Sequence, residues 1–598
     1  MKTLLLLFAL STSAIPPDLV DIARQIEHLP AGPSESARLK HFFDLYWAAK
    51  MRLRPDYAVY VGYSGLEGRL PDFSPEMTEF TIRLSHIELA ALQSIDRARL
   101  TPSEQLNYDL LRRKLEQSIE AERFRALGEY IVVDHMGDSI TDLLAPIGYM
   151  PARNAADYEK MLMLLHGFPR VAEQGMALLA EGLKRGITPP RVTLQHVAER
   201  LEPDLTDDPL KNPLVEPFQH MPDTIPAAER ERLLREAHEA LWQQVVPELR
   251  KLHDYLATTY VPNARDYVSV SDLPDGKAYY AHMLRYYTTT NLTPDEIHDL
   301  GLREVKRIRA EMDAVIAATG FKGTFAEFTN YLRTDPRFFY DKPEDVLAGY
   351  RDITKRIDPE LPKLFGRLPR LPYGVKAMEA GSESAPSALY SNGTLAAGRP
   401  GWMLVNTFDL KARPKWGMES LAAHESVPGH HLQYSLAEEI SDLPEWRKWD
   451  VYPVFSEGWG LYAETLGGEL GLYKDPYSKF GALNNEMWRA IRLVVDTGLH
   501  AKGWSRQQAI DYCRANSAKT EREIANEVDR YIVQPGSVPC YKIGELKIRE
   551  LRRYAEKELG AKFDVRAFHD LILGGGQLPL DLLEKRVKAW VAESGITR

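Results

Sequence analysis

The chain has 598 residues, of which 44% are hydrophobic. That length is enough to bury a large core and to form about three or four domains of ordinary size. The formal net charge of −10 and the lack of a long basic run argue against a nucleic-acid partner. A modest negative charge of this kind favours solubility.

Residues 1–16 have the pattern of a secretory signal peptide, with a basic start at Lys2, the apolar run Leu4–Leu10 and the small residues Ser11–Ala14. The apolar run is far too short to span a bilayer, and no later segment is apolar enough to do so. No cysteine follows the run, which argues against a lipid anchor at that point. We therefore predict an exported protein, periplasmic or secreted, that does not span the membrane. The alternative is a buried N-terminal helix.

Helical periodicity dominates the chain and predicts a mainly α fold. The segment Ala227–Tyr260 carries this periodicity, and we expect Pro247 to kink it. Another helix is predicted to begin at the capping box of Thr293 and Glu296 and to end at Gly320.

Strand patterns are few. The clearest is Gly401–Thr407, which follows a turn-rich stretch, and Tyr130–Val133 is a weaker one. The proline-rich stretch Leu368–Tyr373 is predicted to mark a boundary. We expect a helical N-terminal region over residues 17–370 and a catalytic region over residues 371–598.

The chemically informative stretch starts at His424 and Glu425 and ends at His430 and His431. Zinc-binding helices often read H-E-x-x-H, in which two histidines four residues apart bind the metal and the glutamate is a general base. Here Pro428 occupies the position of the second histidine. On a straight helix His430 would point about 240° away from His424, and His431 would return to the same face about 10 Å along the axis. Neither could share a zinc ion with His424, because zinc–nitrogen bonds are about 2.0–2.1 Å long.

The helix must therefore be distorted, and Pro428-Gly429 is where we expect the distortion. Proline cannot donate the hydrogen bond that the carbonyl of His424 would accept, and glycine adopts dihedrals that are closed to other residues. If the pair loops out as a two-residue bulge, His430 takes the position of the second ligand. We predict His424 and His430 as metal ligands and His431 as a supporting or substrate-contacting group. A role for His431 as the second ligand stays open.

A third protein ligand is expected, because catalytic zinc sites usually have three and leave one position open. Glu457 and Glu464 are seven residues apart and so share one face of a helix. We predict Glu457 as the ligand and Glu464 as the group that orients a ligating histidine; the alternative is an ordinary solvated acidic face. A second pair, His238-Glu239, has no histidine nearby and is expected at the surface.

Cys513 and Cys540 are the only cysteines, which is too few for a cysteine-rich zinc site. In an exported protein they could be joined as a disulfide, or they could equally remain buried thiols. The chain has no nucleophile elbow of a serine hydrolase and no nucleotide-binding phosphate loop.

These motifs resemble those of the bacterial DUF885 family. The residues that carry the resemblance are His424-Glu425-x-x-Pro428-Gly429-His430-His431 and Glu457-Gly458-Trp459-x-x-Tyr462-x-Glu464. That family is grouped with the zincin metallopeptidases, and the likeness extends over most of the mature chain. The arrangement is also similar to helical zincins such as thimet oligopeptidase and the angiotensin-converting enzymes. The resemblance implies a large helical zincin-like fold with a small β-sheet beside the metal-binding helix.

The resemblance implies further roles. In zincins an edge strand before the metal helix pairs with the substrate backbone, and Gly401–Thr407 has that place in the chain. A tyrosine or histidine late in the chain often stabilises the oxyanion. Tyr541 is the first candidate, Tyr531 the second and His500 another; each could instead be an ordinary core residue.

Together these features predict a zinc-dependent peptidase that acts on short peptides, with Glu425 as general base and Tyr541 at the oxyanion. A zinc hydrolase of a non-peptide amide or ester would use the same groups, so that alternative stays open. A non-catalytic exported binding protein is the third hypothesis, although the base and the ligands that it would have lost are all present. The cleavage position and the oligomeric state do not follow from the sequence.

Overall fold

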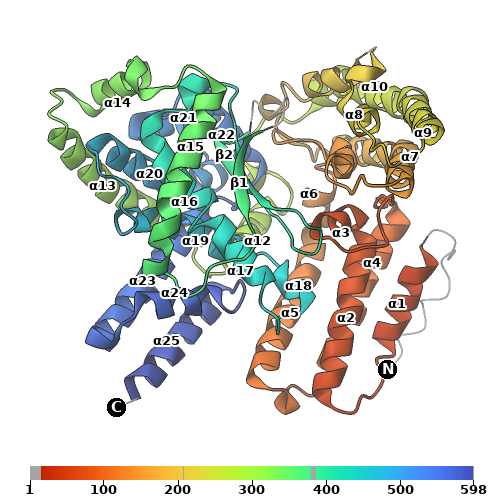
Figure 1. The fold of residues 1–598 in the computed structure, drawn as a ribbon, viewed down its shortest axis with the longest axis horizontal. Coiled ribbons are helices and arrows are strands. Elements are labelled where there is room, and N and C mark those ends of the chain that lie inside the picture. The colour runs from red at the N-terminus through yellow and green to blue at the C-terminus, as the bar shows by residue number, and fades with distance from the viewer. Residues whose placement is uncertain (1–14, 207, 379–384, 597–598) are drawn as a thin grey trace. The chain divides into compact units, whose positions relative to one another are not determined.

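The computed structural model describes residues 15–206, 208–378 and 385–596. Helices make up most of these residues, together with one small mixed sheet, which confirms the predicted fold class (Figure 1). The predicted signal peptide lies outside the described residues except for Ile15 and Pro16. Among the described helices, none has the length and apolar character that a membrane span requires.

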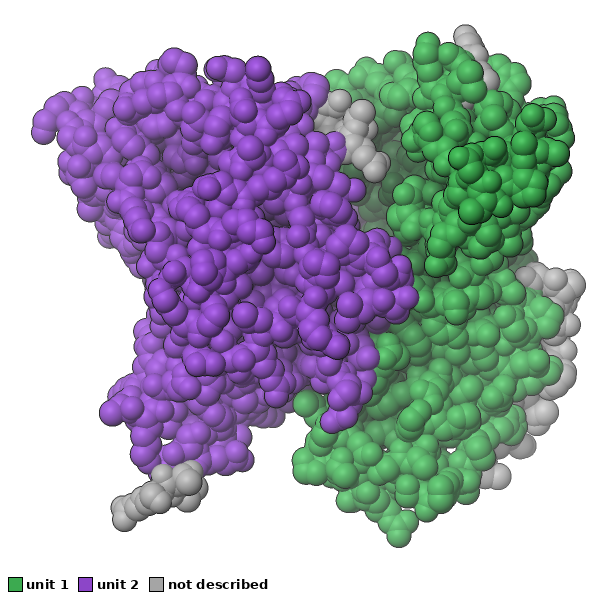
Figure 2. Space-filling model, in the orientation of Figure 1, with its two compact units in different colours: residues 1–265, 444–446 green, residues 266–443, 447–598 purple. Residues whose placement is uncertain are grey.

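The chain divides into two compact units, which are coloured separately in Figure 2. Unit 1 comprises residues 1–265 and 444–446, and unit 2 comprises residues 266–443 and 447–598. Residues 266–370 therefore pack with the part of the chain that carries the His-Glu motif. The functional boundary predicted at residue 370 stays a prediction.

The described part of unit 1 is helical, with a core that includes Leu165, Phe168 and Leu249. The segment predicted to kink at Pro247 contains two π-helical turns. One lies shortly before that proline, and the other lies at the end of the segment. The helices of unit 1 are α1 (Pro17–Glu27), α2 (Glu35–Leu53), α3 (Pro55–Val61), α4 (Pro75–Gln93), α5 (Pro102–Ala121), α6 (Arg125–Glu129), α7 (Ala155–Arg185), α8 (Glu216–Gln219), α9 (Ala227–Ala240), α10 (Val246–Tyr255) and α11 (Val261–Asn263).

The strand predicted at Tyr130–Val133 is not formed. Only an isolated bridge joins Val133 to Asp138. The side chain of Asp138 accepts hydrogen bonds from the backbone of Ile140 and Thr141, which starts a helical turn. The chain therefore turns away before a second strand could form.

Unit 2 is built around α20 (Pro476–Ala501), which is buried over nearly its whole length. It contacts α13 (Pro294–Ala318), α16 (Met418–Glu425), α22 (Glu521–Val533) and α23 (Pro539–Leu559). The capping box of Thr293 and Glu296 starts α13 as predicted. The other helices of unit 2 are α12 (Gly276–Thr288), α14 (Phe325–Thr334), α15 (Pro343–Ile357), α17 (His430–Glu438), α18 (Glu445–Lys448, shared with unit 1), α19 (Pro453–Thr465), α21 (Arg506–Asn516), α24 (Val565–Leu573) and α25 (Leu580–Ile596).

The sheet has the strand order β1-β3-β2. β1 (Tyr373–Ala377) runs parallel to β3 (Gly401–Val405), and β2 (Ala388–Ser391) runs antiparallel to it. The predicted strand is therefore present as β3, but its expected position at an edge is wrong, because it is hydrogen-bonded on both sides. β2 is the edge strand that contacts α16, so the sheet does lie beside the helix of the His-Glu motif.

Cys513 on α21 and Cys540 on α23 are buried thiols and form no disulfide. Burial raises the pKa of both thiols. Buried protonated thiols of this kind behave as small hydrophobic side chains.

Candidate metal centre

The helix that carries the His-Glu pair ends where the sequence predicted a bulge. α16 stops at Glu425, residues 426–429 form a turn, and α17 begins at His430. Pro428 cannot supply the hydrogen bond that would continue the helix. A Cβ atom on Gly429 would lie 1.9 Å from the carbonyl oxygen of His424, so only glycine fits this tight turn. The distortion is thus a complete break between two helices.

Three side chains meet at this break: His424, His430 and Glu457, the last of these from α19. Oε2 of Glu457 lies 3.5 Å from Nε2 of His424 and 3.4 Å from Nε2 of His430. All three ligand atoms lie within 4.8 Å of one another. The ligands of a tetrahedral zinc ion, with bonds of about 2.1 Å, are about 3.4 Å apart. The spacing and the set of two imidazoles and one carboxylate therefore fit a zinc ion.

The orientation of His424 is set by Glu464, which lies two turns beyond Glu457 on α19. Nδ1 of His424 donates to Oε1 of Glu464 at 2.9 Å, which turns Nε2 toward the other two candidate ligand atoms. Glu464 also accepts a hydrogen bond from the Ser420 hydroxyl and pairs with Arg489 at 3.2 Å. A carboxylate that holds a histidine in this way is common next to protein-bound zinc.

The centre gathers negative charge. Burial alone would lower the pKa of His424, but hydrogen bonds to Glu457 and Glu464 and the charge of Glu425 raise it to about 9. Burial opposes ionisation of Glu457 as well, yet the two histidines hold the pKa of this carboxyl well below its usual range. The carboxylates thus attract positive charge to the point between the ligand atoms, and a divalent cation there would satisfy them.

Glu425 lies beside the three candidate ligands without joining them. Its side chain is buried, and no hydrogen bond to its carboxylate is formed within the described parts of the chain. Burial raises its pKa, while the two histidines act in the opposite direction. A buried carboxylate without a partner, next to a metal site, is able to accept a proton from a water molecule bound there.

His431 points away from the three ligand atoms. Its Nε2 donates to the carbonyl of Leu371 at 3.1 Å, and its Nδ1 accepts from the hydroxyl of Tyr390 at 2.9 Å. Burial lowers the pKa of His431 to about 4. With both ring nitrogens engaged, His431 ties α17 to the edge strand β2, on which Tyr390 lies.

Tyr541 lies near the start of α23, which packs along α19, the helix of Glu457. Its ring contacts Arg492, whose guanidinium carbon is 4.4 Å from the ring centroid. Burial raises the pKa of the Tyr541 hydroxyl, and the nearby charge of Glu457 raises it further. No hydrogen bond to this hydroxyl is formed by any described residue, so it can donate to a bound group.

The structure does not bring Tyr531 or His500 to the three ligands. The Tyr531 hydroxyl donates to Glu527 at 2.8 Å and accepts from Arg492 at 3.2 Å. Nε2 of His500 donates to the carbonyl of Tyr531 at 3.0 Å, and its Nδ1 accepts from the backbone of Val270 at 3.2 Å. These bonds occupy both candidates in the packing of α20 against its neighbours.

Trp459 and Gly460, which follow Glu457 on α19, have roles that were not predicted from the sequence. Nε1 of Trp459 donates to the carbonyl of Pro428 at 2.8 Å, which ties α19 to the helix break. Gly460 makes room for the imidazole of His424, because a Cβ atom there would lie 2.8 Å from Cε1 of that ring. A glycine inside a helix next to a candidate ligand is a usable signal of close approach. Arg489 and Ser420 have no such signal in the sequence.

Several solved structures resemble this chain, and two of them match it over almost their whole length. A "putative lipoprotein" from Colwellia psychrerythraea is 26% identical, with a TM-score of 0.87 over 94% of this chain and 100% of that one. A "putative lipoprotein of unknown function" from Shewanella oneidensis is 17% identical, with a TM-score of 0.68 over 92% and 99% of the two chains, and at that identity it shows the fold alone. No curated protein matches the sequence.

The comparison with protein families covers most of the chain. Residues 55–587 match the family described as "Bacterial protein of unknown function (DUF885)". The motifs of the candidate metal centre lie inside the matched residues. The chain therefore belongs to the DUF885 family.

Proposed function

We propose that the protein is a zinc-dependent peptidase whose metal is held by His424, His430 and Glu457. The observation that carries this proposal is the spacing of 3.4 and 3.5 Å between the carboxylate and the two imidazoles, which is the spacing of tetrahedral zinc ligands. The contact of Glu464 with the first histidine and the unpartnered carboxylate of Glu425 support it. A zinc ion bound there would polarise the scissile carbonyl and lower the pKa of the attacking water.

The residues of the chain supply the remaining chemistry. Glu425 accepts a proton as the water oxygen bonds to the carbonyl carbon, and it passes that proton to the amine nitrogen as the carbon–nitrogen bond breaks. The Tyr541 hydroxyl donates a hydrogen bond to the carbonyl oxygen as negative charge develops on it. Glu464 keeps the His424 imidazole in its orientation throughout the reaction, because Ser420 and Arg489 hold the Glu464 carboxylate in place.

The substrate is proposed to be a short peptide that pairs with the edge strand β2. An edge strand offers unpaired backbone groups to an extended peptide. The hydrogen bond between Tyr390 and His431 fixes this strand to α17, which begins with a proposed ligand. We also propose that the protein is exported, because two proteins of similar structure are named as lipoproteins and residues 1–16 have the pattern of a signal peptide.

Mass spectrometry of a defined peptide mixture tests the proposal. The purified wild type, a chelator-treated sample and Glu425→Gln are incubated with the peptides, and bound zinc is quantified in each. A matched control is Glu239→Gln, which changes an exposed glutamate that also follows a histidine but lies on α9 in unit 1. We expect cleavage by the wild type and by the control only, with zinc retained in Glu425→Gln.

Other outcomes separate the competing hypotheses. Cleavage by Glu425→Gln at the rate of the wild type would contradict the proposed role of Glu425 as general base. One zinc per chain without any peptide cleavage would favour a non-peptide amide or ester as substrate. A protein that takes up no zinc would contradict the proposed metal centre.

A further inference from the structure

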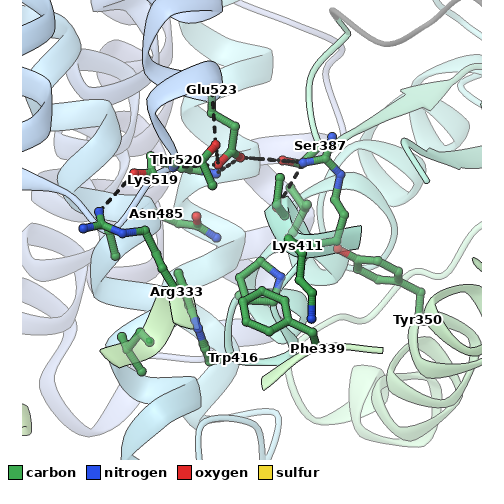
Figure 3. A pocket seen from close by; sticks show the side chains of 17 residues that line it. Arg333, Phe339, Tyr350, Ser387, Lys411, Trp416, Asn485, Lys519, Thr520 and Glu523 are labelled. Carbon is green, nitrogen blue, oxygen red and sulfur yellow. Dashed lines mark hydrogen bonds and ion pairs between the residues drawn. The ribbon is translucent and has the colours of Figure 1, made fainter. Parts of the chain in front are cut away.

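A small polar cavity lies beside the face of α16 that leads to the metal centre (Figure 3). Its volume is about 40 Å³. A cavity that holds a single water has a volume of about 10–15 Å³, so this one has room for a group of a few heavy atoms, such as a carboxylate. Its walls come from α14, α15, α16, α20 and α22, from residues within the segment 411–417 before α16, and from Ser387, which directly precedes β2.

Positive charge dominates the walls of the cavity. Arg333, Lys411, Arg413 and Lys519 line it, against the single carboxylate of Glu523. Glu523 already lies 3.1 Å from the ammonium of Lys519 and 3.7 Å from the guanidinium of Arg413. Arg333 and Lys411 take part in no ion pair with any residue that the structure describes. The cavity thus has unbalanced positive charge, which an anion would neutralise.

Arg413 presents a built donor to the cavity. Its side chain is only 6% exposed. Nε donates to the carbonyl of Asn406 at 2.7 Å, and Nη1 donates to the carbonyl of Ala412 at 3.0 Å and to the hydroxyl of Ser387 at 3.3 Å. Nη2 makes no hydrogen bond within the described residues. A guanidinium that is fixed by three bonds and keeps one nitrogen for a ligand is suited to bind a carboxylate.

One residue in the wall of the cavity interacts electrostatically with the proposed general base. That residue is Tyr350, which lines the cavity and is buried. Burial raises the pKa of the Tyr350 hydroxyl, the charge of Arg413 lowers it, and the charge of Glu425 raises it further. Tyr350 therefore lies within electrostatic reach of both the cavity's guanidinium and the base.

Helix geometry gives the distance from the cavity to the base. Leu421 also lines the cavity and lies four residues before Glu425, which places both on one face of α16, about 6 Å apart along the axis. An extended peptide advances about 3.3 Å per residue. Along this face of α16, the axial separation of Leu421 and Glu425 therefore corresponds to about two residues of an extended peptide.

We infer that this cavity is a subsite for a substrate carboxylate about two residues from the scissile bond, bound by Arg413, Lys411 and Arg333. The inference rests on the proposed peptidase function and names its substrate class. The carboxylate comes either from the C-terminus of the peptide or from an aspartate or glutamate side chain. In Figure 3 Arg333 and Lys519 lie toward one end of the cavity and Tyr350 toward the other.

Matched peptides test this inference. Each sequence is made with a free C-terminal carboxylate and with a carboxamide, and with aspartate or asparagine at each position near the cleaved bond. Cleavage is measured as kcat/KM in the wild type, and binding is measured as Kd by calorimetry in zinc-loaded Glu425→Gln. Charge-assisted hydrogen bonds predict that the carboxylate form is favoured about 10- to 100-fold in both measurements.

The variants Lys411→Gln and Arg333→Gln change the cavity at its less buried side chains, so that folding is preserved. Each should reduce the preference about 3- to 10-fold, because each removes one charge from the anion. The control is Lys415→Gln, since Lys415 contacts the carbonyl of Arg337 and does not line the cavity. It should leave the preference unchanged.

The two measurements separate this inference from the proposed function. Equal cleavage and equal binding of both forms would overturn the inference and leave the peptidase in place. Carboxylate-dependent binding that Lys411→Gln weakens, without cleavage of any peptide, would support the subsite and overturn the peptidase. If aspartate at one position restores the cleavage or binding of a carboxamide peptide, the subsite takes a side-chain carboxylate. If aspartate restores it at no position, the subsite takes the C-terminal carboxylate.

Discussion

Two substitutions of Glu464 should weaken zinc binding to different extents, because one removes only the charge and the other removes the whole carboxylate. In Glu464→Gln the amide oxygen can still accept from Nδ1 of His424, and the amide nitrogen can donate to the Ser420 hydroxyl. Only the charge is lost, so zinc affinity should fall about 10-fold, at the lower end of the range for residues that support a ligand. In Glu464→Ala the imidazole loses its acceptor, and affinity should fall about 100-fold.

The same alanine variant should also lose stability without metal. Arg489 is only 7% exposed, and its 3.2 Å ion pair with Glu464 would be broken. Removal of one partner of a buried ion pair costs about 3–5 kcal/mol, because the other charge stays buried. Urea denaturation of the metal-free proteins measures this difference, and competition with a chromophoric chelator measures zinc affinity.

The matched control is Glu469→Gln, five residues further along the chain. Glu469 pairs with Arg552 at 2.9 Å, but its side chain is 41% exposed. Exposed pairs contribute about 0–1 kcal/mol, so this variant should bind zinc as the wild type does and stay nearly as stable. Zinc affinity in Glu464→Ala equal to that of the wild type would refute the proposed support of the ligand.

Three further predictions concern buried residues of unit 2. Gly460→Ala should weaken zinc binding with little change of overall fold, because its Cβ would lie 2.8–3.0 Å from three atoms of the His424 ring; chelator competition and circular dichroism check this. His569 on α24, whose pKa burial lowers to about 4, is neutral when folded, so stability should fall by up to about 3 kcal/mol as the pH drops from about 6.5 toward 4. Urea titrations at several pH values should show this loss, and His569→Gln should flatten it. Cys513 and Cys540 should react with a thiol reagent only after unfolding, and one reactive thiol or none in the denatured, unreduced protein would contradict the structure.

The local rules of helices explain how much of the centre could be predicted. The seven-residue spacing of Glu457 and Glu464 placed both on the inner face of α19, where the structure has them beside the two histidines. The impossibility of a straight helix through His424 and His430 required a distortion at Pro428-Gly429. The extent of that distortion did not follow, because a bulge and a complete break both satisfy the same backbone constraints.

Contacts between distant segments were beyond these rules. Arg489 supports the centre from α20, and nothing in its own helix distinguishes it from any other arginine. The position of β3 in the middle of the sheet depends on which strands pair with it, and its alternating pattern is the same at an edge and in the centre. The cavity around Arg413 likewise arises from several separate helices and Ser387, so it could be seen only once the chain was folded.

Anomalous X-ray diffraction at the zinc edge, from crystals grown with the metal, tests the central claim most directly. We expect one anomalous peak per chain at about 2.0–2.2 Å from Nε2 of His424, Nε2 of His430 and a carboxylate oxygen of Glu457. The metal-free variant His424→Ala should lack it. A peak ligated by His431, or no peak at the break between α16 and α17 in zinc-replete crystals, would contradict the account.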